Sequence, residues 1–345
     1  MMRLPHFRFE SPRTIAEAAE LLASAPQGEA MLVAGGTDLL PNMKRRQQTP
    51  RTLIGLRRVE ELHRTSNGDG FRIGAGVTLA ELVRDGRIRE RFGALWQAAS
   101  RVATPQLRNM GTIGGNLCLD TRCNYYDQNY EWRKAIDFCM KKDGATCWVA
   151  TSSPRCLAVS STDTAPALIA LGAEVTLVSA RGARAIPIAD LYRNDGIHYL
   201  TRAADEILTA VRLPRLDRWR SVYWKLRRRG AFDFPVLSVA AAIKVAADGA
   251  VEEARLVLGA VASRPVEAPG ASAALIGEPL SDTSIARAAE LAAQPARPMD
   301  NTDFTLLWRK RVTRDFVGYA LRELRGDDMR EVKMKMRNQE LVVGN

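Results

Sequence analysis

The chain contains 345 residues, of which 46% are hydrophobic and 26% are charged, and its formal net charge is +11. This length exceeds the roughly 250–300 residues beyond which a single core tends to divide, so we expect more than one domain. The charge favours anionic partners, but only 6% of the residues are aromatic and the basic residues are spread along the chain, which argues against nucleic-acid binding. No apolar run resembles a signal segment or approaches the ~18 residues of a membrane span, so we predict a cytoplasmic protein without membrane association.

The first recognisable elements are a helix and a buried strand. Ser11 and Pro12 form a typical helix start, and Thr14 and Glu17 have the spacing of a capping box. The apolar run 30–34 then predicts a short strand that ends in Gly35-Gly36-Thr37-Asp38. Glycines let backbone N–H groups approach phosphate oxygens, so this loop is a candidate anion-binding loop. A purely structural turn is the alternative interpretation.

Two later glycine-containing segments have a similar character. Residues 73–78 predict a turn from a strand into a helix, with Thr78 and Glu81 at capping-box spacing. Residues 103–116 are more distinctive, because three glycines, two asparagines, two threonines and one arginine occupy a single loop. Such a concentration of exposed backbone and hydrogen-bond donors suits a diphosphate and a polar heterocycle.

The remaining pattern predicts alternating elements and one boundary. A helix is expected from Asp163, as its cap, to Gly172, followed by strands at 174–179 and 206–213. The polar stretch 215–220 indicates a domain boundary. Beyond it, strands are expected at 221–226, 236–246 and 251–261, helices at 281–293 and 303–325, and a loosely held tail over the last twenty residues.

All five cysteines lie between Cys118 and Cys156. Thiols grouped in this way indicate a disulfide framework, a zinc site or an iron–sulfur cluster. A chain without an export signal is expected in a reducing compartment, which disfavours disulfides. The absence of a CxxC pair disfavours zinc, whereas four thiolates are the usual requirement of a [4Fe–4S] cluster. Only three histidines occur, and neither GxSxG nor HExxH is present, so no side chain is assigned as catalytic.

The order of these motifs resembles the FAD-binding subunit of the molybdenum hydroxylases. The resemblance is carried by residues 34–39, residues 108–116, Asp163 with the Pro166-Ala167-Leu168 that follows it, Glu206-Ile207-Leu208 and Pro214. It extends over roughly residues 5–325 and implies an α+β fold class. The implied organisation is a two-subdomain α/β FAD-binding domain at 1–215, a C-terminal α+β domain at 216–325 and a basic tail at 326–345.

The same resemblance implies which residues contact FAD. The first glycine loop is expected to hold the diphosphate, Asp163 to lie near the ribityl chain, Leu208 to offer a backbone contact and Lys225 to lie close to the ring. The full implied set is Leu32, Val33, Ala34, Gly35, Gly36, Thr37, Asp38, Leu39, Ala103, Thr112, Ile113, Gly114, Gly115, Asn116, Asp163, Leu208 and Lys225.

The cysteine window is an insertion relative to most of that family. Asn116 and Asp163 are 47 positions apart, which leaves about thirty extra residues between the second glycine loop and the following helix. The steps of 16, 8 and 9 residues between successive cysteines resemble the β subunits of 4-hydroxybenzoyl-CoA reductases, whose inserted loop holds a [4Fe–4S] cluster. The resemblance implies Cys123, Cys139, Cys147 and Cys156 as ligands in an insertion at 118–158, and leaves Cys118 as a buried thiol.

This second resemblance implies an electron-transfer subunit. Electrons would enter from ferredoxin and pass through [4Fe–4S] and FAD to [2Fe–2S] clusters on a small subunit and a molybdenum cofactor on a large subunit. The large subunit would reductively dehydroxylate 4-hydroxybenzoyl-CoA to benzoyl-CoA. The implied assembly is a dimer of heterotrimers.

Two other functions are compatible with parts of the pattern. The chain could be the FAD subunit of an oxidising molybdenum hydroxylase, related to xanthine or carbon monoxide dehydrogenase, in which the insertion holds a structural metal. It could also be a zinc-bearing binding module without redox activity. The cysteine insertion distinguishes the reductase from the first alternative, and the FAD motifs oppose the second.

Overall fold

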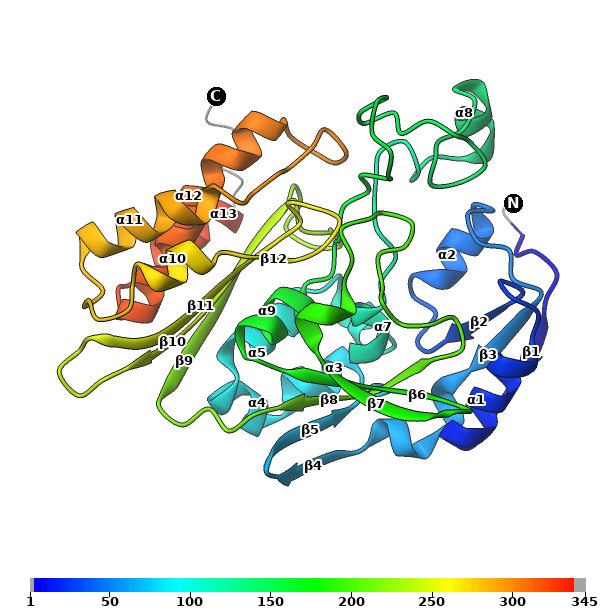
Figure 1. Ribbon diagram of the computed structural model, residues 1–345, viewed down its shortest axis with the longest axis horizontal. Coiled ribbons are helices and arrows are strands. Elements are labelled where there is room, and N and C mark those ends of the chain that lie inside the picture. The colour runs from blue at the N-terminus through cyan, green and yellow to red at the C-terminus, as the bar shows by residue number, and fades with distance from the viewer. Residues whose placement is uncertain (1–2, 338–345) are drawn as a thin grey trace.

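A computed structural model describes residues 3–337 and shows three sheets with helices packed between and outside them (Figure 1). The N-terminal sheet is parallel, with the strand order β1-β3-β2. Its strands are β1 (Arg8–Glu10), β2 (Ala30–Val33) and β3 (Thr52–Gly55). They are connected by α1 (Ile15–Ser24) and α2 (Leu39–Lys44), and the 3-10 turns η1 (Leu56–Arg58) and η2 (Glu60–His63) follow.

The second sheet is antiparallel and has the strand order β4-β5-β8-β6-β7. Its strands are β4 (Thr65–Gly68), β5 (Gly70–Gly74), β6 (Glu174–Ser179), β7 (Gly182–Pro187) and β8 (Ile207–Leu213). The chain leaves this sheet after β5 to form α3 (Leu79–Arg84), α4 (Gly86–Arg91), α5 (Gly93–Ser100), α6 (Pro105–Arg108) and α7 (Ile113–Leu117). It returns through α9 (Thr164–Ala170), and the turn η3 (Ile188–Leu191) follows β7.

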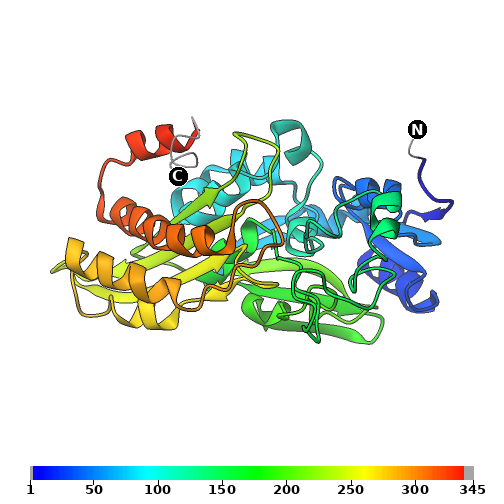
Figure 2. The same cartoon turned by 90° about the horizontal axis from the view of Figure 1, so that it is seen from above.

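The C-terminal sheet is antiparallel, with the order β12-β11-β10-β9. Its strands are β9 (Trp219–Leu226), β10 (Leu237–Val245), β11 (Val251–Gly259) and β12 (Val266–Glu267). The helices of this part are α10 (Pro269–Ala273), α11 (Asp282–Ala293), α12 (Leu306–Arg325) and α13 (Arg330–Arg337), and Figure 2 shows α11 and α12 lying along one side of the sheet.

The central strand β10 of the C-terminal sheet is buried on both faces, which explains why it is apolar almost throughout. Successive side chains of a strand point to opposite faces. Trp224, Val239 and Leu258 therefore join the core formed with α11 and α12, whereas Tyr223 and Ala240 join the core of the preceding domain. The sheet thus connects the two halves of the molecule through hydrophobic packing rather than through a flexible linker.

The segment between α7 and α9 rises above the sheets at the top of Figure 1. It contains one helix, α8 (Tyr130–Ala135), and otherwise consists of turns and loops. A small hydrophobic cluster fills it, formed by Cys123, Tyr126, Cys139, Cys156 and Ala158. The insertion therefore has little apolar core of its own.

Most of the predicted elements are confirmed, and so is the mixed α/β fold class. Thr14 caps α1, Thr78 and Glu81 form a complete capping box at α3, and the helices predicted at 281–293 and 303–325 are α11 and α12. Asp163 occupies the N-cap position of α9, but its side chain makes no capping hydrogen bond there.

Residues 326–337 differ from the loosely held tail that we expected. Residues 330–337 form α13, in which Lys333 pairs with Glu323 of α12 at 2.8 Å, and Met329 just before the helix is buried against the C-terminal core. Residues 338–345 lie outside the described part of the chain. Within residues 3–337, no helix combines the length and apolar character needed to cross a bilayer.

Two leucines of α12 provide a test of this packing. Leu321 is fully buried in the C-terminal core, whereas Leu307 on the same helix is 73% exposed. We expect Leu321→Ala to lower the free energy of unfolding by about 2–5 kcal/mol, because it removes buried methyl groups and leaves a cavity. Leu307→Ala is expected to change it by less than about 0.5 kcal/mol. Denaturant titration compares the two variants, and equal effects would contradict the packing of α12 against the sheet.

Candidate functional site

A cleft of about 610 Å³ lies in the first two thirds of the chain. Its walls come from β2 and the loop after it, from residues 102–116, from β8, and from the loop 229–234 of the C-terminal domain. Small-molecule and cofactor sites typically have volumes of about 300–1,000 Å³. The cleft therefore has the size of a site for a large organic cofactor.

The first glycine loop is packed directly against the second. A Cβ atom at Gly35 would overlap the backbone carbonyl of Met110, so only glycine permits this contact. Gly36 has a φ of +69°, a conformation that glycine adopts without strain. Asp38 closes the loop, because its carboxylate pairs with the Arg122 guanidinium and accepts a hydrogen bond from Asn42 at 3.0 Å.

The second glycine loop is held by its own polar side chains. Thr112 caps α7, where its hydroxyl accepts a hydrogen bond from the Gly115 N–H at 3.0 Å. The Asn116 side-chain oxygen accepts hydrogen bonds from Thr162 at 2.9 Å and from the Thr164 hydroxyl at 2.7 Å. Asn116 therefore fixes the start of α9 against the loop. Gly115 faces the cleft, and a Cβ atom there would meet only the Thr112 hydroxyl, at 3.1 Å.

A buried ion pair lies beneath the cleft. The Lys225 ammonium donates to the Asp163 carboxylate at 2.9 Å, and the Tyr223 hydroxyl donates to the other carboxylate oxygen at 2.7 Å. Burial raises the pKa of the Asp163 carboxyl, and the neighbouring Lys225 acts in the opposite direction. Lys225 also donates to the backbone carbonyls of Arg101 and Asp233. The ammonium is thus satisfied by protein groups on several sides.

The charged groups that line the cleft leave an excess of positive charge. Four carboxylates reach its wall, and each has a basic partner: Asp38 with Arg122, Asp120 with Lys141, Asp163 with Lys225, and Asp233 with Arg229. Arg45, Arg57 and Arg202 line the cleft in addition, without a salt bridge to any of these carboxylates. Guanidinium groups bind phosphate oxygens well, so the cleft is suited to a diphosphate.

Nearly all residues predicted to contact FAD line this single cleft. The exceptions are Ile113, which is fully buried in the core, and Lys225, whose side chain is buried against Asp163. The sequence interpretation missed the three arginines and the pair Phe232 and Phe234, which lie on the loop at the cleft wall with 58% and 43% exposure. No local motif marks these residues, because the three arginines and the Phe232–Phe234 loop come from four different parts of the chain.

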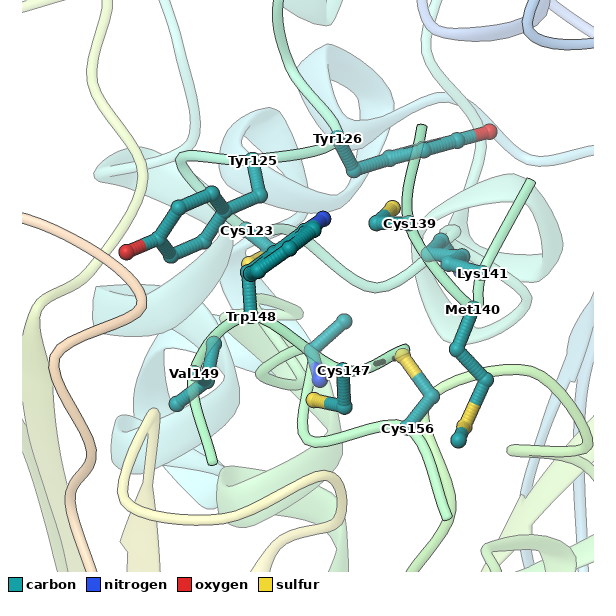
Figure 3. A pocket seen from close by; sticks show the side chains of 11 residues that line it. Cys123, Tyr125, Tyr126, Cys139, Met140, Lys141, Cys147, Trp148, Val149 and Cys156 are labelled. Atoms are coloured by element: carbon teal, nitrogen blue, oxygen red, sulfur yellow. Dashed lines mark hydrogen bonds between the residues drawn. The ribbon is translucent and has the colours of Figure 1, made fainter. Parts of the chain in front are cut away.

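Four of the five cysteines line a second, smaller cavity inside the insertion. Cys123, Cys139, Cys147 and Cys156 are all buried around it, and Figure 3 shows them on separate loop segments with Tyr125, Tyr126 and Trp148 beside them. Cys118 does not join them, because it lines the large cleft instead. The tertiary structure therefore brings together the same four thiols that the spacing in the sequence singled out.

The surroundings of the four thiols are largely apolar and tightly packed. Burial raises the pKa of Cys123 to about 12 and that of Cys156 to about 11. Gly196 packs so closely on Cys156 that a Cβ atom would lie 2.6 Å from the sulfur. Tyr130, Trp132 and Trp148 are partly exposed on the outside of the insertion, where Tyr130 contacts Phe138 and Trp132 contacts Tyr125. These rings cover the loops around the cavity.

The donor set of this cavity matches an iron–sulfur cluster in number and type. Four cysteines are the usual ligands of a [4Fe–4S] cluster. Among residues 3–337, no three histidine, cysteine or carboxylate side chains are placed to hold one metal ion. A zinc ion needs its thiolates about 2.3 Å from a single centre, whereas a cluster distributes them over several iron atoms.

A layer of polar side chains separates the cleft from the cysteine cavity. Lys141 lines the cysteine cavity and donates to Asp120, which lines the cleft, at 2.8 Å. Arg122, which precedes Cys123 in the chain, reaches Asp38 in the first glycine loop. The Arg122 guanidinium also lies 4.8 Å from the ring centre of Phe234. The two cavities are thus neighbours that share one wall.

Comparison with known proteins identifies the class to which this fold and cleft belong. Residues 5–216 match the family described as the FAD binding domain in molybdopterin dehydrogenase. Residues 221–324 match the CO dehydrogenase flavoprotein C-terminal domain. The chain therefore belongs to the family of FAD-binding subunits of the molybdenum hydroxylases, and it is an oxidoreductase subunit.

Individual relatives cover nearly the whole chain. It is 34% identical over 321 residues to the aldehyde oxidoreductase FAD-binding subunit PaoB of Escherichia coli, a match that covers 88% of this chain and 95% of the relative. It is 30% identical to the nicotinate dehydrogenase FAD-subunit of Eubacterium barkeri, covering 80% and 81%. Among solved structures, carbon monoxide dehydrogenase from Hydrogenophaga pseudoflava matches with a TM-score of 0.77 and 25% identity, covering 93% and 97%.

Gly115 provides a test of the second glycine loop. We expect Gly115→Val to fold but to purify with much less FAD, because the new side chain would enter the cleft and meet only Thr112 in the protein itself. Gly270→Val on α10 is the matched control, since a Cβ atom there meets nothing within 4 Å and lies outside the cleft. Flavin absorbance per protein measures the effect. Full occupancy in Gly115→Val would remove this loop from the cofactor site.

The buried ion pair predicts that a second substitution restores most of the stability that a first substitution removes. Lys225→Met should lower the free energy of unfolding by about 3–5 kcal/mol, because it leaves the Asp163 carboxylate buried without its partner. The double variant Asp163→Asn/Lys225→Met removes both charges and should recover most of that stability. Denaturant midpoints of the wild type and the two variants provide the comparison. A double variant as unstable as the single one would contradict this explanation.

Proposed function

We propose that this chain is the FAD-binding, electron-transferring subunit of an oxidising molybdenum hydroxylase, and that its insertion holds a [4Fe–4S] cluster. The observation that carries the first part is the arginine-rich cleft lined by the two glycine loops, in a chain of the FAD-binding family. The oxidising direction is supported by the relatives, which are named for an aldehyde oxidoreductase and a nicotinate dehydrogenase. The cluster is supported by the four thiols around one cavity.

The residues of the cleft would bind and orient the cofactor. FAD exchanges electrons in pairs or singly, and an iron–sulfur cluster exchanges them one at a time. In the proposed arrangement, the backbone of residues 32–39 and the arginines hold the diphosphate, and Leu208 on β8 forms an apolar wall. Phe232 and Phe234 cover the cleft from the side of the C-terminal domain. The Asp163 carboxylate is held in place by Lys225 and Tyr223.

The wall that the two cavities share supports a role in electron transfer between the cluster and FAD. Asp120, Arg122 and Lys141 connect the two sites through direct hydrogen bonds and ion pairs, so both groups would lie in one rigid unit. The chain would receive electrons from a small subunit with [2Fe–2S] clusters, which in turn takes them from a large subunit with the molybdenum cofactor. The dimer of heterotrimers and the cytoplasmic location stay predictions from the sequence.

A second candidate function is the reductive one. The spacing of the four cysteines resembles the β subunits of 4-hydroxybenzoyl-CoA reductases, and the structure gathers those four thiols around one cavity. In that case ferredoxin would deliver electrons through the cluster and FAD to the molybdenum subunit. The relatives favour the oxidising direction, and the cysteine cavity alone favours the reductive one.

The spectrum and iron content of the protein purified without air test the cofactors. We expect flavin bands together with a broad iron–sulfur absorbance, and about four iron atoms per FAD. Serine substitution of Cys123, Cys139, Cys147 or Cys156 should lower the iron content, whereas Cys118→Ser should leave it unchanged. Loss of iron in Cys118→Ser, with retention in one of the other four variants, would show that the ligand assignment is wrong. A protein with flavin but no iron would reject the cluster altogether.

Assays of the whole complex decide the direction of electron flow. The isolated chain should accept electrons from a low-potential donor but should turn over no substrate. With its molybdenum and [2Fe–2S] partners, an oxidising enzyme should reduce an artificial acceptor with an aldehyde or an N-heteroaromatic substrate. Dehydroxylation of 4-hydroxybenzoyl-CoA by the complex with reduced viologen, without the oxidising activity, would establish the second candidate instead.

A further inference from the structure

Asn301 joins the two ends of the cysteine insertion to the C-terminal domain. Its backbone carbonyl accepts a hydrogen bond from the N–H of Asn124 at 2.9 Å, and its side-chain amide donates to the carbonyl of Leu157 at 2.6 Å. Asn124 follows Cys123, and Leu157 follows Cys156. A single residue therefore holds both the first and the last of the four cysteine-bearing segments.

Asn301 is itself held rigidly. It is 3% exposed, and its side-chain oxygen lies 3.4 Å from a guanidinium nitrogen of Arg309, which also donates to the Met299 carbonyl at 2.8 Å. The amide orientation follows from both partners, because a flipped side chain would place its oxygen against the Leu157 carbonyl. Arg309 is fully buried on α12 and further donates to the carbonyls of Val236 and Ala260.

The contact crosses from one part of the molecule to another. Asn301 lies on the loop between α11 and α12, which extends toward the insertion in Figure 1. Leu157 and Asn301 are 144 positions apart in the sequence. The insertion has only a small apolar cluster, so these hydrogen bonds are a substantial part of what fixes the separation of its two ends.

We propose that Asn301 is a positioning residue for the iron–sulfur cluster, and that through Arg309 it ties the geometry of Cys123 and Cys156 to the C-terminal domain. This inference rests on the proposed function, because it requires that the four cysteines bind a cluster. Residues that orient metal ligands without touching the metal typically change metal affinity or activity by about 10–100-fold when they are replaced.

The test uses the full-length chain purified without air, together with any partner subunits that accompany it. We expect Asn301→Ala to release iron to a chelator about tenfold faster than the wild type. Its reduced cluster should also show an altered electron paramagnetic resonance spectrum, while its FAD content stays unchanged. Asn301→Asp should behave similarly, because its carboxylate can pair with Arg309 but cannot donate to the Leu157 carbonyl.

Asn129→Ala is the matched control within the insertion. Asn129 caps α8 by accepting a hydrogen bond from the Trp132 N–H at 2.9 Å. Unlike Asn301, it does not join the residues that follow Cys123 and Cys156. Its iron release and spectrum should equal those of the wild type. If Asn301→Ala and Asn301→Asp release iron at the wild-type rate with an unchanged spectrum, the positioning role is overturned while the cluster stands. An iron-free wild type overturns the cluster and this inference together.

Hydrogen exchange in the wild type provides a measurement that needs no variant. Coupling between two sites is reciprocal, so a loop that holds the ligands must itself be stabilised by the bound cluster. Peptides covering residues 299–303 should exchange faster after iron is removed, as should those containing Cys139 and Cys147. Unchanged exchange at 299–303, with faster exchange around Cys139 and Cys147, would overturn the proposed coupling even if the variants failed to fold.

Discussion

The buried ion pair between Asp163 and Lys225 is the polar contact that fixes how the two domains meet beneath the cleft. Asp163 starts α9 in the first domain, and Lys225 comes from β9 in the C-terminal domain. Two charges taken out of water are stable only when they face each other and all their hydrogen-bonding groups are satisfied. This requirement fixes the C-terminal sheet against α9, and the cleft forms directly above the contact. Tyr223 on the same strand adds a third partner.

The cleft follows from that fixed arrangement. One of its walls is the loop 229–234, which the C-terminal domain contributes, and the two glycine loops form other walls. Because a Cβ atom at Gly35 would overlap the Met110 carbonyl, the two loops touch each other before any ligand is present. Each carboxylate in the wall is paired with a basic side chain, so the remaining arginines make the electrostatic potential of the cleft positive. The protein thereby offers a preformed anionic-cofactor site rather than one assembled by the ligand.

The insertion is stabilised differently from the rest of the molecule. It has one short helix and a small cluster of apolar side chains, and it relies on neighbours for its shape. Arg122 connects it to the first glycine loop, Lys141 connects its cavity to the cleft wall, and Asn301 connects both of its ends to the C-terminal domain. Four thiols gathered in such a loop-built region would gain much of their geometry from these contacts and from the group that they bind.

The sequence by itself determined the features that arise from neighbouring residues. Capping at Thr14 and Thr78, the apolar strands and the glycine loops were all predictable, because helix caps, strand alternation and turn chemistry act over a few residues. The order of these motifs was also enough to indicate the family. Even Asp163 was correctly placed at the start of a helix, although its carboxylate does not cap it.

Only the tertiary structure decided which distant groups meet. Asp163 and Lys225 are 62 positions apart, Asp38 and Arg122 are 84 apart, and Leu157 and Asn301 are 144 apart. Nothing in the local sequence shows that Lys225 turns away from the cleft to pair with Asp163, or that Cys118 faces the cleft while the other cysteines share a separate cavity. Burial of a charge or a polar group selects its partner from the whole folded chain, so these contacts emerge only once the sheets and helices are packed.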